Sequence, residues 1–236
     1  MHNQNHVFFR QSFEEAIQID PKFGRAYTWL ANTYLDKIDL RLTTQRERVI
    51  ENAEQAIQMA LTADPDYPPY STISRIARIK KDVETAIIYG RKGVQQAPND
   101  SGRHYMLCLA LERGERFEEA VESCETALRL VPFRPVNYVT DLAWSLVGNA
   151  QYDKSIPLFK EVIDRSPQSF YAYLAYKGLT AAYELSDRRA EAHWAAQNVL
   201  RMNPNFSLEK ESRLSPAKEG PFKERMLNAY RSAGLK

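Results

Sequence analysis

The sequence predicts an all-α protein, an α-solenoid of antiparallel helix pairs with a C-terminal capping helix, and three observations support this fold class. First, a short phrase recurs in three places, each time ending on a proline: EEAIQIDP (14–21), EQAIQMALTADP (54–65) and EEAVESCETALRLVP (118–132). Second, the separations between repeat-ending prolines are 44, 33, 34, 35 and 37 residues, for prolines at Pro21, Pro65, Pro98, Pro132, Pro167 and Pro204. Third, apolar and small residues recur three and four positions apart, which gives each helix one apolar stripe. Because one helix pair cannot bury its stripe alone, stacked pairs must share a core.

Composition excludes several other classes. The chain has 236 residues, of which 44% are hydrophobic and 26% charged, as in folded water-soluble proteins. A formal net charge of +2 creates no field that would require nucleic acid or a membrane as partner. The start, MHNQNHVFFRQS, lacks the charged and apolar regions of a secretory signal. With only two cysteines, we expect a reducing compartment, most simply the cytoplasm.

The spacing and residue types resemble the tetratricopeptide repeat (TPR), which has a period of about 34 residues. Residues 101–135 match well: the first-helix positions of the repeat are occupied by His104, Leu107, Cys108 and Leu111, and those of the second helix by Ala120, Cys124 and Ala127. The resemblance implies a right-handed superhelix with a concave groove lined by the first helix of each pair. The TPR array is expected over 1–206, with a half repeat at 7–23 and full repeats at 24–66, 67–100, 101–135, 136–169 and 170–206.

The first repeats carry two irregularities. The half repeat lacks its first helix, so the apolar face of Phe9 and Phe13 is expected to be uncovered. We expect either that the chain is a fragment or that another element or subunit covers this end; a homodimer through the uncapped end is one such arrangement. The repeat at 24–66 is nine residues too long, and the excess around 35–52 is interpreted as helix extensions joined by a longer loop.

The last part, 207–236, is interpreted as a linker and a capping helix. Phe222, Met226 and Tyr230 recur every four residues, and Gly234 ends the helix. This helix is expected to cover the apolar face of the last repeat.

Three segments resemble the C-terminal TPR region of bacterial class III adenylate/guanylate cyclases. They are FRQSFEEAIQIDPKFGRAYTWLANTYL, the stretched second unit continuing into AEQAIQMALTADPDYP, and the tail from NPNFSLEKESRL to PFKERMLNAYRSAGLK. The resemblance implies a regulatory or oligomerisation region of a larger bacterial enzyme. No cyclase catalytic domain lies in this chain, so no catalytic role passes to any of its residues.

The sequence contains no catalytic, cofactor or metal motif: GxxxxGK[ST], GxGxxG and HExxH are all missing. His2 and His6 have helical spacing, but we expect a disordered end there rather than a metal site. His104 is expected to be a hydrogen-bonded structural residue. Cys108 and Cys124 fall on facing helices of one repeat and could approach each other, although reduced core thiols are expected.

The TPR register implies which side chains face the concave groove: Arg25, Asn32, Arg75, Arg78, Tyr105, Leu109, Arg113, Trp144 and Lys177. Arginine with tyrosine or tryptophan is typical of interface hot spots, and arginine binds carboxylates through two parallel hydrogen bonds. We therefore expect a protein or peptide partner that carries acidic residues; ordinary solvated side chains are the alternative reading. The basic run RIARIKK (75–81) is short and lacks stacking aromatics, so no nucleic-acid partner is expected, and no membrane partner either.

The favoured function is a non-catalytic interaction scaffold that holds a partner segment in this groove. The alternative is the regulatory region of an enzyme such as a nucleotide cyclase. An independent enzyme is not expected.

Overall fold

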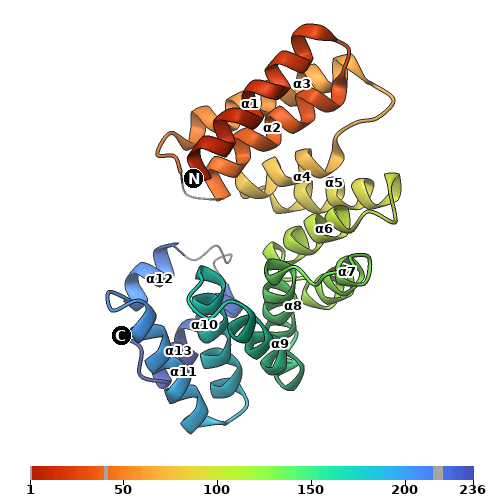
Figure 1. Ribbon diagram of the computed structural model, residues 1–236. Helices are drawn as coiled ribbons and strands as arrows, with labels where there is room; N and C mark the ends of the chain where they lie inside the picture. The colour runs from red at the N-terminus through yellow and green to blue at the C-terminus, as the bar shows by residue number, and fades with distance from the viewer. Residues whose placement is uncertain (1, 40–41, 215–219) are drawn as a thin grey trace. The chain divides into compact units, whose positions relative to one another are not determined.

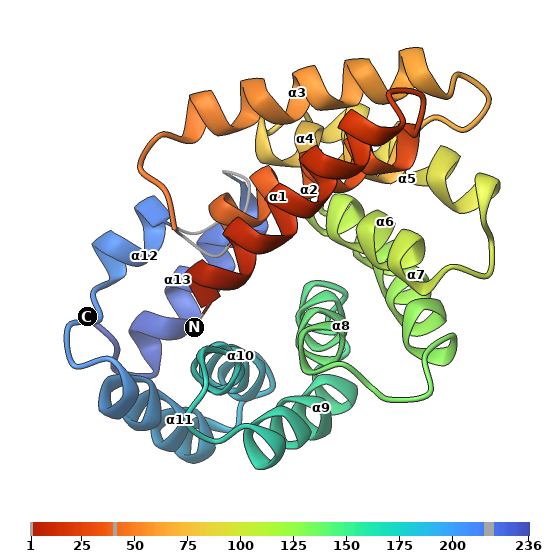
Figure 2. The same ribbon diagram turned by 45° about the horizontal axis from the view of Figure 1, so that its top comes forward.

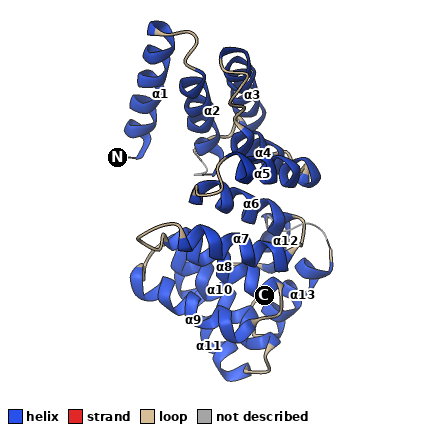
Figure 3. Ribbon diagram, turned by 90° about the vertical axis from the view of Figure 1, so that its right-hand side faces the viewer, coloured by secondary structure: helices blue, strands red, loops and turns tan. Residues whose placement is uncertain are grey.

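The computed structural model describes residues 2–39, 42–214 and 220–236, without the side chains of residues 2–7, 39 and 214. Over these ranges the regular structure is entirely helical, with thirteen α-helices and no strand (Figure 3). The chain divides into two compact units, Met1–Gln96 and Ala97–Lys236. The predicted all-α fold of helix pairs is therefore confirmed.

Unit 1 holds one single helix and two helix pairs (Figure 1). Its helices are α1 (His2–Ile19), α2 (Gly24–Asp39), α3 (Arg46–Ala63), α4 (Tyr70–Ile79) and α5 (Val83–Gln96). α2 pairs with α3 and α4 with α5, while α1 packs against α2 as the predicted half repeat requires. The backbone is helical from residue 2, where a disordered end was expected, and the side chains of His2 and His6 lie outside the described residues.

The long second repeat agrees with the prediction of extended helices. α2 has 16 residues and α3 has 18, against 10 and 14 for the next pair, α4 and α5. The first residue of α3, Arg46, donates from its guanidinium to the carbonyl oxygen of Ile79 at 2.9 Å. The start of the longer α3 is thereby tied to the end of α4.

Unit 2 contains three helix pairs and two further helices. The pairs are α6 (Ser101–Arg113) with α7 (Phe117–Arg129), α8 (Val136–Gly148) with α9 (Tyr152–Arg165), and α10 (Phe170–Leu185) with α11 (Arg189–Met202). The tail forms α12 (Leu208–Leu214) and α13 (Pro221–Ser232). Each new first helix packs mainly on the second helix before it, α8 on α7 and α10 on α9.

The helix crossings fall where the repeat register places small residues. These positions are fully buried at Ala31, Ala53, Cys108, Ala120 and Ala143. A small side chain lets two helix backbones approach, and the larger apolar residues of each stripe then fill the space between successive pairs. The apolar stripes read from the sequence are thus the shared core.

Four first helices end in the same backbone turn. Lys81, Glu115, Ala150 and Asp187 have φ values of 66°, 57°, 56° and 58°. After α6, the N–H of Glu115 bonds to the carbonyl of Glu112 and that of Arg116 to the carbonyl of Leu111, which is the Schellman pattern. The same two bonds follow α4, α8 and α10. The left-handed residue is Glu115 rather than the neighbouring Gly114, whose φ is −83°.

The two cysteines form a disulfide, so the prediction of reduced thiols is wrong. Cys108 on α6 and Cys124 on α7 have Cα atoms 5.4 Å apart, within the range that a disulfide spans. The physical reason is that both occupy small-residue positions of one helix crossing. Because disulfides persist mainly in oxidising compartments, this bond removes the sequence argument for a cytoplasmic location.

The apolar side of α1 is partly uncovered, as predicted for a half repeat. Phe9 is 52% exposed, and the neighbouring Phe8 is 66% exposed. Phe13 stacks instead on Trp29 of α2, with ring centroids 6.3 Å apart.

Candidate partner-binding site

The nine predicted groove residues lie on first helices, four of them in unit 1 and five in unit 2. Those of unit 1 are on α2 and α4: Arg25, Asn32, Arg75 and Arg78. Those of unit 2 are on α6, α8 and α10: Tyr105, Leu109, Arg113, Trp144 and Lys177.

In unit 1, two of the four residues bind each other across α2 and α4. The Arg75 guanidinium donates to Asp36 at 2.6 Å and to the side-chain oxygen of Asn32 at 3.1 Å. The Asn32 amide donates in turn to the Thr72 hydroxyl at 3.1 Å. Arg25 is exposed and lies over the Tyr67 ring at 5.6 Å, and Arg78 is half-buried. The Asn32–Asp36–Arg75 network thus joins successive first helices and places the arginine's charge against the chain's own carboxylate.

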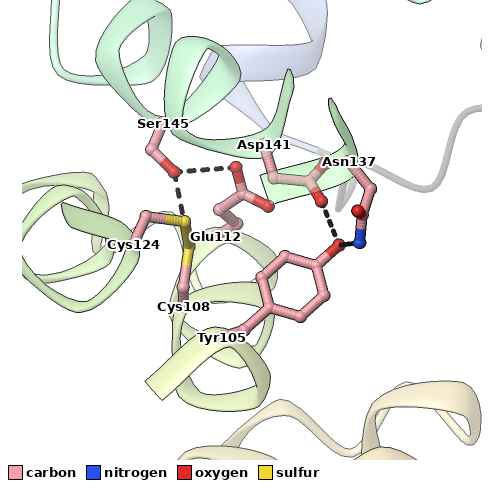
Figure 4. The surroundings of a disulfide bond; sticks show 7 residues. All are labelled: Tyr105, Cys108, Glu112, Cys124, Asn137, Asp141 and Ser145. Carbon is pink, nitrogen blue, oxygen red and sulfur yellow. Dashed lines mark hydrogen bonds between the residues drawn. A yellow bond between two sulfur atoms is a disulfide. The ribbon is translucent and has the colours of Figure 1, made fainter. Parts of the chain in front are cut away.

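In unit 2, Tyr105 is the centre of a hydrogen-bonded group between α6 and α8 (Figure 4). Its hydroxyl donates to Asp141 at 2.5 Å and accepts from the Asn137 amide at 3.1 Å. Its ring stacks on Tyr138 with centroids 3.8 Å apart. Burial raises the pKa of Tyr105 well above its usual value, and the negative charge of Asp141 raises it further. The hydroxyl therefore stays protonated and keeps donating to Asp141.

Tyr171, at the start of α10, adds a tyrosine on the next first helix of unit 2. Its side chain is 38% exposed. Partial burial raises the pKa of Tyr171, and the negative charge of Asp141 raises it further. We name Tyr105, Asn137, Tyr138, Asp141 and Tyr171 the tyrosine patch.

A second polar link lies beside the patch, over the disulfide (Figure 4). The Ser145 hydroxyl of α8 donates to Glu112 of α6 at 2.8 Å and lies 3.8 Å from the Cys108 sulfur. Cys108, whose disulfide joins α6 to α7, therefore also lies against Ser145 at the contact between α6 and α8.

The remaining groove residues of unit 2 differ in availability. Leu109 and Arg113 are half-buried. Trp144 packs edge-on against Phe159 of α9, with centroids 5.6 Å apart, so it belongs partly to the core. Lys177 is buried and forms an ion pair of 2.6 Å with Glu211 of α12, with 10% and 16% of the two side chains exposed.

Sequence reasoning missed four members of the patch, Asn137, Tyr138, Asp141 and Tyr171, and the partner of Lys177. Asn137 falls at the second position of its repeat, where the groove register applies, and Asp141 lies one helical turn later on the same face. These two could have been found. Tyr138 and Glu211 could not, because ring stacking and the return of the tail to α10 leave no local pattern.

His104 is the structural histidine that its register predicted. Its Nε2 lies 2.8 Å from the carbonyl oxygen of Pro98. Among the described residues, no group of three or more His, Cys, Asp or Glu side chains is arranged to hold a metal ion. None of the described helices has both the length and the apolar character needed to span a membrane.

Comparisons with solved structures place these helix pairs in a known architecture. YrrB, described as a TPR protein with an unusual peptide-binding site, has 17% sequence identity and a TM-score of 0.60, over 83% of this chain and 94% of its own. The Cut9–Hcn1 hetero-tetramer of the APC/C matches at 15% identity and a TM-score of 0.69, over 95% of this chain and 39% of that one. Pseudomonas aeruginosa pilF matches at 17% identity and a TM-score of 0.63, with 87% of each chain covered.

No family model matches the sequence. A search of curated proteins likewise found no match. The structural matches show that the chain has the TPR fold, an α-solenoid. The resemblance to the repeats of cyclases stays a prediction.

Proposed function

We propose that this chain is a non-catalytic scaffold that holds a segment of a partner protein against the first-helix side of its repeats. In unit 2 the contact is the tyrosine patch. The observation that carries the proposal is a row of partly exposed tyrosines on three successive first helices, in which Tyr105 and Tyr138 are held by contacts within the patch. Tyrosine is enriched at binding hot spots because it offers a large, rigid surface with a polar end.

Preorganisation supports this assignment. Tyr105 is held by Asp141, Asn137 and the Tyr138 ring before any partner arrives. Ordering rotamer-rich side chains weakens binding by about 0.5–1.5 kcal/mol each, and side chains that are already ordered avoid that loss. YrrB, with the same fold, is described as having a peptide-binding site.

The expected acidic partner has weaker support than the groove itself. Arg75 and Lys177, two of the predicted cations, are paired with Asp36 and Glu211 of the same chain. Asp141 adds a carboxylate to the tyrosine patch. We therefore propose that the segment held at the patch offers hydrogen-bond donors and an aromatic or aliphatic anchor rather than a run of carboxylates.

Binding of peptides selected from a phage-displayed random library tests this function. Tyr171→Ala should weaken the selected peptides by about tenfold or more, as the loss of a hot-spot side chain does. Leu200→Ala is the matched control, because Leu200 is exposed to the same extent as Tyr171 (38%) but lies on α11, a second helix. Trp144→Ala is a poorer test of binding, because loss of its contact with Phe159 would also change the stability of the fold. Equal affinity of the Tyr171 variant and the parent, or no enrichment of any peptide, would contradict the proposal.

A further inference from the structure

The last helix, α13, does not continue the stack of helix pairs. A next first helix would pack mainly on α11, as α8 packs on α7 and α10 on α9. The main partners of α13 are instead α10 and α12, and Figures 1 and 2 show it beside α10. The tail thus lies on the first-helix side of unit 2, the side that carries the tyrosine patch.

The N-terminal end of α13 reaches back to two earlier repeats. The Phe222 ring lies 4.7 Å from the ring of Phe117, at the start of α7. Arg225 donates to the carbonyl oxygen of Gly148 at 3.2 Å and so satisfies a carbonyl at the end of α8. With its contact on α10, α13 touches all three repeats of unit 2.

The rest of the tail is anchored on α10. Met226 and Tyr230 are 5% and 2% exposed, and the Lys177 ammonium lies 5.9 Å from the centre of the Tyr230 ring. Glu211 of α12 completes the contact by pairing with Lys177. A largely buried ammonium needs such a carboxylate, because a charge without a partner is costly away from water.

Two open hollows border this segment. A hollow of about 450 Å³ opens between the end of α10 and α13, beside Leu185, Arg225 and Asn228. Another of about 470 Å³ lies between α12 and α13, beside Leu208 and Leu227. The side chains that border these hollows face solvent, so on these sides α12 and α13 gain no packing from the rest of the unit.

We propose that α12 and α13 act as a built-in ligand of a second binding site, next to the tyrosine patch, and that a partner's amphipathic helix takes this site by displacing them. The tail itself defines the chemistry of that helix. It offers aromatic and aliphatic anchors four residues apart for α10, and a carboxylate that pairs with Lys177.

Charge reversal of the ion pair tests the proposal in the full chain. The probe is a fluorescent synthetic peptide of residues 206–236, and the readout is its anisotropy. In the Glu211→Lys variant, the lysine introduced into the tail repels Lys177, so the tail is held less tightly on α10. The added peptide keeps Glu211 and can still form the ion pair with Lys177. The variant should bind the peptide about tenfold or more tightly than the parent, whose site is filled from within its own chain.

Two variants control for the charge change. Glu209→Lys makes the same substitution on an exposed residue of α12 and should bind the peptide as weakly as the parent. Lys177→Glu with Glu211→Lys restores an ion pair in the chain and opposes the peptide's Glu211, so binding should become weak again. Hydrogen exchange should show faster exchange in α13 of Glu211→Lys by about tenfold, with α6–α11 unchanged.

Three results would overturn the proposal. They are equal peptide binding by Glu211→Lys and Glu209→Lys, no binding by any variant, or a dimer of the parent chain whose dissociation frees α13. In such a dimer, the site of each chain would hold the tail of the other copy. Tyr171→Ala should leave binding of the tail peptide to Glu211→Lys unchanged, so failure at this site and failure at the tyrosine patch are distinguishable.

Discussion

Ala150 has a backbone conformation that alanine rarely adopts, with φ of 56° at the end of α8. Lys81, Glu115 and Asp187 do the same after α4, α6 and α10, so the requirement comes from the turn of the repeat and not from one local sequence. In the left-handed region the Cβ atom of an L-residue is crowded by its own backbone, at a cost of about 1–2 kcal/mol. The turn persists because the two Schellman hydrogen bonds satisfy carbonyls of the first helix.

Ala150→Gly should therefore increase the free energy of unfolding by about 1 kcal/mol, because glycine adopts this φ without crowding. Urea unfolding followed by circular dichroism measures the change. Ala190→Gly, at an exposed helical position of α11, is the control and should lower stability. A loss of stability in both variants would count against strain at Ala150.

A second prediction concerns Tyr105 and the stability of the fold at alkaline pH. Burial and then Asp141 raise its pKa in the folded chain well above the value of about 10 in the unfolded chain. A raised folded pKa contributes stability that is complete below pH ~10 and is lost as the pH rises through the folded pKa. Tyr105→Phe should be less stable at pH 7 by about 1–3 kcal/mol, because Asp141 loses a donor.

The deficit of Tyr105→Phe relative to the parent should shrink above pH ~10, since only the parent must keep this hydroxyl protonated to stay folded. Urea titrations between pH 7 and 11 measure the difference. A deficit that stays constant over this range would rule out Tyr105 as a source of alkaline instability. Tyr34, Tyr138, Tyr171 and Tyr230 also have raised pKa values, so the parent's own profile reports the sum of all these groups and only the difference isolates Tyr105.

At the scale of the elements, the helix pairs could be predicted closely from the sequence. Proline after each second helix and small residues at each crossing fix the pairing through local sterics, so Cys108, Ala120 and Ala143 were placed in the core correctly. The period also led to the prediction of which first-helix side chains would face a groove. What these side chains bind could not be predicted, because Arg75–Asp36 and Lys177–Glu211 join residues 39 and 34 positions apart. The amphipathic pattern of α13 predicted that it covers the last repeat, but its contacts with Phe117 and Gly148 of the two earlier repeats could not be predicted.

The disulfide is another contact that was not predicted from the sequence, and it leads to a test of stability. It closes a sequence separation of 16 residues between α6 and α7. In the chain-entropy model a loop of this length contributes about 3 kcal/mol to stability. The double variant Cys108→Ala, Cys124→Ala should thus be about 2–4 kcal/mol less stable than the parent in urea unfolding.

A reducing agent should destabilise the parent and leave the double variant unchanged. Thiol titration of the denatured, non-reduced parent should find no reactive cysteine. Two reactive thiols per chain, together with equal stability of parent and variant, would show that the bond does not form.

At the scale of the whole molecule, each unit is a series of helix pairs in which neighbouring repeats contact each other. In such arrays stability is close to a sum of terms for repeats and for the contacts between them. The first helices are joined to one another by polar groups such as Asn32–Thr72 and Tyr105–Asp141, while most of the packing in each unit is between first and second helices. This division leaves the first-helix side polar, aromatic and ordered, as a binding surface requires. It is also why a scaffold function could be expected from the sequence while the partner could not.

The central claim is that partners bind to the first-helix side of the repeats, and hydrogen exchange with and without a library-selected peptide tests it most directly. The account predicts that bound peptide slows exchange in α6, α8 and α10, most strongly around Tyr105, Tyr138 and Tyr171. Slower exchange confined to the second helices α7, α9 and α11 would contradict it.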